Sequence, residues 1–238
     1  MKILAIDSSG MVASIAVIED EKLIGEFTIN YKKTHSQTLL PMLDEVAKMI
    51  ELDLNTIDAI AVAAGPGSFT GLRIGSATAK GLGLALDKPL ISIPTVDGLA
   101  YNLAGCSTLV CPLMDARRNQ VYTGIYSFAG YQLQTHLAQC AVSIEDIISQ
   151  VNQYSREVIF LGDGVAVHAS YIEEYCSVPY TFAPAHLNQQ RASASAVLAA
   201  SYYQAGKTES AAGHRPDYLR KPQAERERER RLTSRNKQ

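Results

Sequence analysis

Short apolar runs alternate with helical patterns along this chain. Three segments rich in Ile and Val, residues 2–7, 12–18 and 22–29, are separated by short polar turns, which is typical of an antiparallel meander. The pattern then predicts a helix from about 37 to 51, a buried strand at 59–64, a helix from Ser68 to Leu86 and a strand at 88–93.

The same order of elements begins again after residue 100. Strands are predicted at 109–115, 120–128 and 131–137, a helix at 143–153, a strand at 157–161 and a helix at 166–176. This repetition predicts an α/β protein with two lobes, residues 1–100 and 101–214, each built on a β-β-β-α-β-α unit. One alternative is that an Ala-rich helix predicted at 192–205 packs back on the first lobe.

The helix that follows strand 59–64 carries very small residues at every fourth position. Gly71, Gly75, Ala79 and Gly83 form a stripe with almost no side chains, although each Gly costs about 1 kcal/mol of helix propensity relative to Ala. This cost indicates that something approaches the stripe closely. Ahead of the helix, the turn 65–67 leaves free backbone N–H groups at a helix N-terminus, an arrangement that holds phosphate in many proteins.

The predicted helix at 37–51 has an unusually wide apolar face. Its central stripe contains Leu39, Leu43, Val46 and Ile50, and further apolar residues widen the arc to about 180°, beyond the roughly 100° that one core requires. The extra width allows two interpretations, a deeper core or a face that binds a partner. The residues that widen the arc are Leu40, Met42, Ala47 and Met49.

Charge is distributed unevenly over the 238 residues. From residue 215 onward there are nine basic and four acidic residues, a net charge of +5, which leaves 13 basic and 20 acidic residues, or −7, in residues 1–214. An acidic body binds nucleic acid poorly, so only the tail at 215–238 has a suitable charge. Its alternating Glu and Arg residues favour disorder over a solvated helix.

Metal and nucleotide motifs of the common kinds are missing from the sequence. The four Cys and five His residues show no metal-ligand spacing, and the turn at 65–71 matches neither a Rossmann fingerprint nor a Walker P-loop. The opening residues contain Asp7 too early for a signal peptide, and no apolar run reaches the roughly 20 residues of a membrane span. We therefore expect a cytoplasmic protein without a metal site.

Asp7-Ser8-Ser9-Gly10 ends the first predicted strand and resembles the first phosphate turn of the fold shared by actin, Hsp70 and the sugar kinases (ASKHA). The alternative is an ordinary Ser-Gly hairpin. In the second lobe the corresponding turn is Asp115-Ala116-Arg117-Arg118, where bulky side chains replace the small ones. Gly162-Asp163-Gly164 occupies the place of the adenosine loop, although such a turn is weak support for a nucleotide site.

Four segments of the sequence form specific motifs: Ile6-Asp7-Ser8-Ser9, the segment 35–41 (HSQTLLP), the segment 65–75 (GPGSFTGLRIG) and the segment 216–220 (PDYLR). Together they resemble the bacterial family of tRNA threonylcarbamoyladenosine biosynthesis proteins known as TsaB or YeaZ. The family is a paralogue of the metal-dependent transferase TsaD. The resemblance implies the two-lobed actin-like fold and a role in threonylcarbamoyladenosine modification of tRNA.

Comparison with the catalytic paralogue TsaD implies that this chain is not an enzyme. The two metal-binding histidines of TsaD fall here on Thr95 and Leu99, and Leu cannot bind a metal. The family resemblance implies a TsaD-like transferase and a TsaE-like ATPase as partners, a homodimer as a further option, and contact with tRNA only through the complex. No cofactor is expected in the chain, apart from ATP or ADP held weakly or at the complex interface.

Two sets of residues carry the resulting site predictions. The partner interface is predicted at Leu39, Leu40, Met42, Leu43, Val46, Met49, Gly71, Leu72, Gly75, Ala79 and Gly83. A vestigial nucleotide-binding set is predicted at Asp7, Ser8, Ser9, Gly65, Gly67 and Ser68. Competing hypotheses are a stand-alone ATP-dependent kinase-like enzyme and, with less support because no His pair exists, a metallopeptidase.

Overall fold

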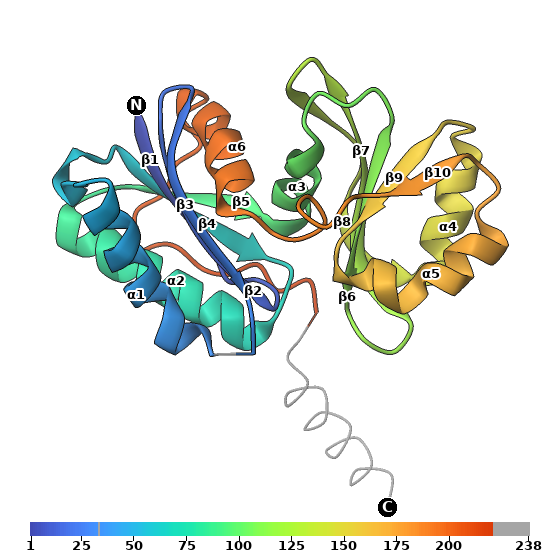
Figure 1. Ribbon diagram of the computed structural model, residues 1–238, viewed down its shortest axis with the longest axis horizontal. Helices are drawn as coiled ribbons and strands as arrows, with labels where there is room; N and C mark the ends of the chain where they lie inside the picture. The colour runs from blue at the N-terminus through green and yellow to red at the C-terminus, as the bar shows by residue number, and fades with distance from the viewer. Residues whose placement is uncertain (33, 221–238) are drawn as a thin grey trace, which may run out of the picture.

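Two mixed β-sheets form the centres of the two lobes (Figure 1). The structure, a computed structural model, describes residues 1–32 and 34–220. In the first sheet the strand order is β3-β2-β1-β4-β5, with antiparallel pairing in the meander β1-β2-β3 and parallel pairing of β1 with β4 and of β4 with β5. The strands are β1 (Lys2–Asp7), β2 (Val12–Glu19), β3 (Lys22–Asn30), β4 (Ala59–Gly65) and β5 (Leu90–Pro94).

The second sheet repeats this topology strand for strand. Its order is β8-β7-β6-β9-β10, again with two antiparallel pairings in the meander and two parallel pairings after it. Its strands are β6 (Leu109–Asp115), β7 (Gln120–Ala129), β8 (Gln132–Ser143), β9 (Val158–Leu161) and β10 (Tyr180–Phe182). The predicted duplication and the α/β actin-like fold are therefore confirmed, and the short strand β10 is the member that the sequence analysis missed.

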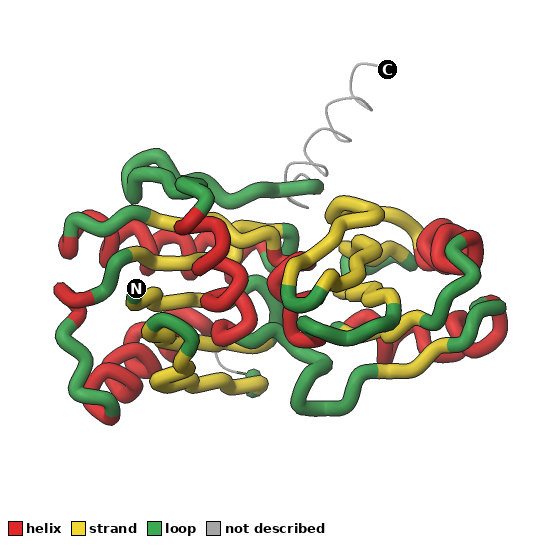
Figure 2. Tube along the Cα trace, turned by 90° about the horizontal axis from the view of Figure 1, so that it is seen from above, coloured by secondary structure: helices red, strands yellow, loops and turns green. Residues whose placement is uncertain are grey.

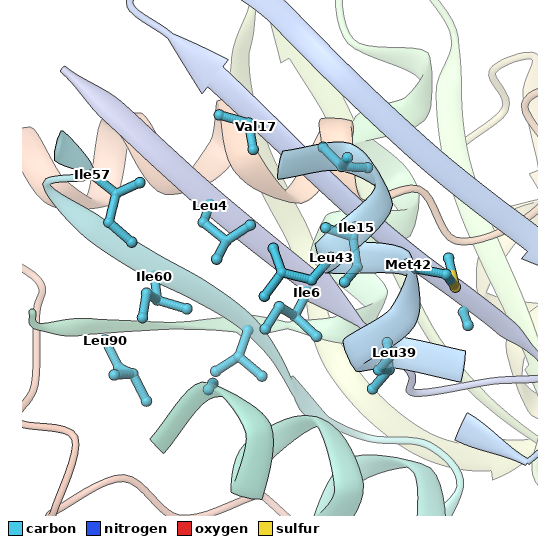
Figure 3. Packing of buried hydrophobic residues seen from close by; sticks show 14 of the residues in the cluster. Leu4, Ile6, Ile15, Val17, Leu39, Met42, Leu43, Ile57, Ile60 and Leu90 are labelled. Atoms are coloured by element: carbon cyan, nitrogen blue, oxygen red, sulfur yellow. The ribbon is translucent and has the colours of Figure 1, made fainter. Parts of the chain in front are cut away.

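Two long helices cover one face of the first sheet. They are α1 (His35–Met49) and α2 (Phe69–Leu86), with the 3₁₀ turn Leu54–Thr56 between them in sequence. Figure 3 shows Leu43 of α1 beside the sheet residues Leu4 and Ile6, and Leu39 and Met42 of the same helix belong to the same buried cluster. The wide apolar face of α1 therefore belongs mostly to a deep core.

In the second lobe α4 (Ile144–Gln153) and α5 (Asp163–Tyr175) take the corresponding places. Ser143 caps α4 by accepting a hydrogen bond from the Asp146 N–H at 3.1 Å. Three apolar residues of α4, Ile144, Ile147 and Ile148, lie in the core beneath the second sheet. The sequence analysis placed the start of α5 three residues too late.

Each lobe is packed against a helix that follows the other lobe in sequence. The short helix α3 (Thr95–Ala100) and the 3₁₀ turn Tyr101–Leu103 follow the first sheet, yet α3 packs on β6 and β7 of the second. Conversely, α6 (Ala192–Gln204) follows the second lobe and covers the free face of the first sheet (Figure 1). The packing of helix 192–205 on the first lobe is confirmed, and the predicted boundary at residue 100 does not separate two independent cores.

After α6 the chain returns along the first lobe as an extended segment, residues 205–220, which we call the C-terminal strap. Figure 2 shows it running along the outside of this lobe towards the second. Leu90 of β5 exchanges two backbone hydrogen bonds with Glu209, both at 2.9 Å. The predicted tail beginning at residue 215 is therefore wrong for residues 215–220, which are packed; the rest of that tail, 221–238, lies outside the described residues.

Candidate functional site

The predicted nucleotide turns lie together at the ends of β1 and β4. The Ser68 N–H donates to the Ser9 carbonyl at 2.7 Å, and the Ser68 hydroxyl caps α2 by accepting from the Gly71 N–H at 3.3 Å. A Cβ on Gly67 would lie within 3.0 Å of the Ser9 carbonyl oxygen, so only Gly fits there. The structure thus brings together two segments that are about 60 residues apart in sequence, and nucleotide binding by them stays a prediction.

Asp7 and the two following serines are buried and bonded within the chain. Asp7 is 2% exposed, and its Oδ1 accepts hydrogen bonds from the Ser9 N–H at 2.9 Å and the Ser9 hydroxyl at 2.7 Å. The Ser8 hydroxyl donates to the Gly71 carbonyl at 2.8 Å. Burial raises the pKa of Asp7, although the hydrogen bonds from Ser9 and the nearby His35 act in the opposite direction. These polar groups are thereby committed to internal contacts.

The glycine stripe of α2 faces inward, which corrects the predicted partner interface. Cβ atoms on Gly71 and Gly75 would lie within 3.0 Å of the carbonyl oxygen and the hydroxyl of Ser8, respectively. A Cβ on Gly83 would lie within 3.0 Å of side-chain atoms of Leu90 and Ala211, and Ala79 is fully buried. The close approach predicted from the stripe is real, but the approaching groups are the β1–β2 turn, β5 and the strap of the same chain.

Most of the apolar residues assigned to that interface are also buried. Only Leu40 and Met49 are exposed, at 56% and 83%. Hydrophobic packing within the first lobe explains the error, because an apolar arc looks the same whether it covers a deep core or a partner. The members that lie in the core are Leu39, Met42, Leu43, Val46 and Leu72.

The outer faces of α1 and α2 carry a different set of residues. On α2, Ala77, Gly81 and Ala85 are exposed at spacings of four, beside Leu84, which is 63% exposed. Apart from its own turns of helix, nothing in residues 1–32 and 34–220 lies within 4 Å of the position that a Gly81 Cβ would take. Sequence reasoning missed this second small-residue stripe, although the Gly and Ala residues at spacings of four were its signal.

The strap covers the turn at residue 65. The Asp217 N–H donates to the Ala64 carbonyl at 2.6 Å, and a Cβ on Gly65, whose φ is +125°, would collide with the Asp217 carbonyl. At the next residue of the strap, the Tyr218 ring lies 4.9 Å from the Phe69 ring. The end of β4 and the start of α2 are therefore covered by the segment that the sequence analysis assigned to the tail.

A buried polar cluster holds the strap in place. His214 is fully buried, with its Nε2 3.0 Å from the Ser76 hydroxyl and its Nδ1 2.9 Å from the Glu209 carboxylate. The Ser92 hydroxyl also contacts both His214 and Glu209. Although burial alone would raise the pKa of Glu209, the hydrogen bonds from Ser92 and His214 and the charge of His214 and Lys80 hold it below its usual range. Ser76 and His214 are both enclosed, so this arrangement anchors the strap.

The corresponding turns of the second lobe keep the backbone arrangement without the small residues. Asp163 Oδ1 accepts from the Asp115 N–H at 3.0 Å, and Asp115 Oδ1 accepts from the Arg117 N–H at 2.7 Å. Burial and the charge of Asp115 raise the pKa of Asp163, although backbone N–H donors oppose this. The side chains of Arg117 and Arg118 are exposed at the mouth of this turn.

Thr95 and Leu99, which the family resemblance predicts to stand where TsaD carries metal ligands, are used here for packing. The Thr95 hydroxyl oxygen accepts from the Gly65 N–H at 3.2 Å, and Leu99, 1% exposed, lies in the core of the second lobe. Within residues 1–32 and 34–220 no group of three or more His, Cys, Asp or Glu side chains is arranged to hold a metal ion. The same residues contain no helix with the length and apolarity needed to cross a membrane.

Comparison with known proteins identifies relatives of this chain. The family model described as "TsaD: tRNA N6-adenosine threonylcarbamoyltransferase" matches residues 22–228. The protein named "tRNA threonylcarbamoyladenosine biosynthesis protein TsaB" of Bacillus subtilis (strain 168) is 34% identical over 228 residues, 94% of this chain and 96% of the relative. Its namesake in Haemophilus influenzae is 32% identical over 187 residues, 73% of this chain and 77% of the relative.

A solved structure agrees with these relatives. The structure titled "YeaZ from Pseudomonas aeruginosa" superimposes with a TM-score of 0.77 and 25% identity, and the match covers 92% of this chain and 99% of that one. The family model, the relatives and the shared fold agree over almost the whole length, and the chain belongs to the TsaB family of tRNA threonylcarbamoyladenosine biosynthesis proteins.

Proposed function

We propose that this chain is a non-catalytic subunit in tRNA threonylcarbamoyladenosine biosynthesis and that it binds a TsaD-like transferase through the outer faces of α1 and α2. The observation that carries the proposal is the outer surface of α2, where the exposed side chain of Leu84 lies beside the exposed small residues Ala77, Gly81 and Ala85. An exposed large apolar side chain beside bare helix backbone is typical of a surface that a protein partner covers. On the neighbouring α1, Leu40 and Met49 are exposed on the two opposite flanks of the buried stripe.

The exposed stripe Ala77, Gly81 and Ala85 supports helix-on-helix docking in particular. Because these residues have little or no side chain, a partner helix can approach the backbone of α2 closely and place its own side chains in the resulting groove. Charged residues such as Asp44 and Lys48, paired at 2.5 Å on the exposed side of α1, would form the polar rim of such an interface.

Internal packing at the inherited sites supports the non-catalytic part of the proposal. Thr95 and Leu99 are engaged within the chain, and the Ser8-Ser9 turn is packed against α2. We further propose that a TsaE-like ATPase joins the assembly, that ATP or ADP binds only at the complex interface, and that a homodimer uses the same outer face when the transferase is absent.

The interface is tested by measuring the dissociation constant between the chain and a TsaD-like transferase. Leu84→Glu places a charge on the proposed face and should weaken binding at least ten-fold, or about 1.4 kcal/mol, while the circular dichroism spectrum stays unchanged. The matched control is Val167→Glu on α5 of the other lobe, at a side chain of similar exposure, 60% against 63%. Unchanged affinity of Leu84→Glu, or equal losses in both variants, would overturn the proposed interface.

A further inference from the structure

Four arginines lie along the edge where the two lobes meet, and we call them the arginine rim: Arg73, Arg117, Arg118 and Arg220. Contacts through the strap connect them. Arg73 Nε donates to the Tyr218 hydroxyl at 3.4 Å, and two residues later Arg220 reaches across to the second lobe, where it donates to the Ala116 carbonyl at 2.7 Å. Arg117 and Arg118 follow Ala116 directly, so the two lobes contribute to one basic edge.

The rim keeps its positive charge. Among the ion pairs formed within the described part of the chain, none includes an arginine of the rim. Arg117, Arg118 and Arg73 have exposed side chains, and the Asp115 carboxylate accepts its hydrogen bond from the backbone N–H of Arg117 rather than from a guanidinium group. Unneutralised guanidinium groups on one edge attract a partner with several negative charges.

The backbone of the β6–β7 turn is held in an uncommon conformation. Arg117, Arg118 and Asn119 have φ values of +61°, +58° and +59°, in the left-handed region that residues with a Cβ rarely adopt. Tight hairpin turns use positive φ at their central residues, usually with Gly or Asn there, whereas two of the three residues in this turn are exposed arginines. Strain of this kind is typical of turns that present side chains to a ligand.

Aromatic rings accompany the arginines. The Arg73 guanidinium carbon lies 3.9 Å from the centroid of the Phe69 ring, and this ring in turn contacts Tyr218. Guanidinium groups bind phosphate oxygens in a bidentate manner, and rings beside them offer a surface for unstacked bases.

We propose that the arginine rim binds the phosphodiester backbone of the tRNA substrate directly, so that this chain takes part in holding the RNA as well as the transferase. The proposal rests on the proposed function, because tRNA is the polyanion on which that pathway acts. It locates the contact on the edge formed by the α2 start, the strap and the β6–β7 turn. Arg73 lies one helical turn before Ala77, so this edge adjoins the outer face proposed for the transferase, whereas Arg117 and Arg118 lie on the second lobe.

The test measures binding of a fluorescent tRNA transcript by anisotropy, with the full chain alone and with the transferase complex, between about 50 and 200 mM NaCl. The variant is Arg117→Asn with Arg118→Asn. Asn removes both charges and tolerates positive φ better than Arg, so the turn keeps its shape. The control variant is Arg156→Gln with Lys207→Gln, which removes two basic side chains that are exposed elsewhere on the molecule.

The rim variant should bind tRNA about ten-fold more weakly at the lower salt concentration and reduce the slope of log affinity against log salt by about 0.7 to 0.9 for each phosphate group that is no longer neutralised. It should still bind the transferase with unchanged affinity, which separates a failure here from a failure of the proposed interface. Wild-type affinity and slope in the rim variant, an equal loss in the control, or no tRNA binding by the wild-type chain in either form would overturn the proposal. ATP binding that depends on the rim arginines without tRNA binding would do the same.

Discussion

Two glycines on one helix offer the sharpest test of the packing of α2. Gly71 and Gly81 both lie inside α2, so replacing either by Ala should gain about 1 kcal/mol of helix propensity. At Gly81 the new methyl group would meet no described atom outside its own helix within 4 Å, and at Gly71 it would collide with the backbone carbonyl of Ser8. The same substitution should therefore have opposite effects at the two positions.

The magnitudes follow from these contacts. Gly81→Ala should stabilise the chain by about 1 kcal/mol. Gly71→Ala forces the β1–β2 turn away from α2, which costs about 1–3 kcal/mol for overpacking and about 1 kcal/mol for the disturbed hydrogen bond from the Ser8 hydroxyl, offset by the same helical gain. Gly75→Ala should fall between them, because the atom in its way is the Ser8 hydroxyl, which can rotate.

Urea unfolding followed by circular dichroism measures these differences directly. The expected order of the free energy of unfolding is Gly81→Ala above wild type, then Gly75→Ala, then Gly71→Ala, with about 2–4 kcal/mol between the extremes. Equal stability of Gly71→Ala and Gly81→Ala would refute the inward orientation of the stripe. The outer small-residue stripe of α2 would then lose its structural basis as well.

Three further substitutions or conditions test other parts of the structure. Met42→Glu, at a side chain 2% exposed, should lower the free energy of unfolding by about 3–5 kcal/mol because it buries an unpaired charge, and an unchanged melting temperature would contradict this. Asp7→Asn should stabilise the chain at pH 8 and lose this advantage in acid, because the raised pKa of Asp7 means that its ionised form is penalised on folding; urea unfolding at both pH values measures the difference. The pKa values of Glu26 and Glu209 are lowered on folding: burial alone would raise them, but Arg191 and Ser193 outweigh it at Glu26, and Ser92 and His214 at Glu209. The two ionised carboxylates therefore stabilise the fold fully above their unfolded pKa of about 4.3, and this stabilisation is lost as the pH falls through their lower folded pKa values. In a pH series of unfolding curves, the free energy of unfolding of Glu209→Gln should fall less steeply in acid than that of the wild type.

Much of the fold could be predicted from the sequence because local patterns encode it. Apolar segments separated by short polar turns indicated both meanders, and Ser68 after a Gly-rich turn indicated the start of α2. The short elements α3 and β10 were missed because six and three residues carry too little periodicity to distinguish a helix or a strand from a loop.

The candidate site was predicted less well, since its residues depend on long-range contacts. The spacing of Gly71, Gly75 and Gly83 indicates close approach without saying what approaches, and the approaching groups include Ser8 and Ala211, far away in sequence. Likewise, nothing local distinguishes the buried Met42 from the exposed Met49 seven residues later on the same helix. The packed strap escaped notice because extended segments without alternation resemble disordered chain.

The exchange of α3 and α6 between the lobes has a consequence for biosynthesis. The face of the first sheet that carries Ile3 and Ile91 is closed by Ala196 and Ala199 of α6, which are made roughly a hundred residues after β5. On the ribosome, at about 5–20 residues per second, this apolar face therefore stays open for about 5–20 s while the second lobe is synthesised. The newly made first half is the stage at which a chaperone that shields exposed apolar surface would act.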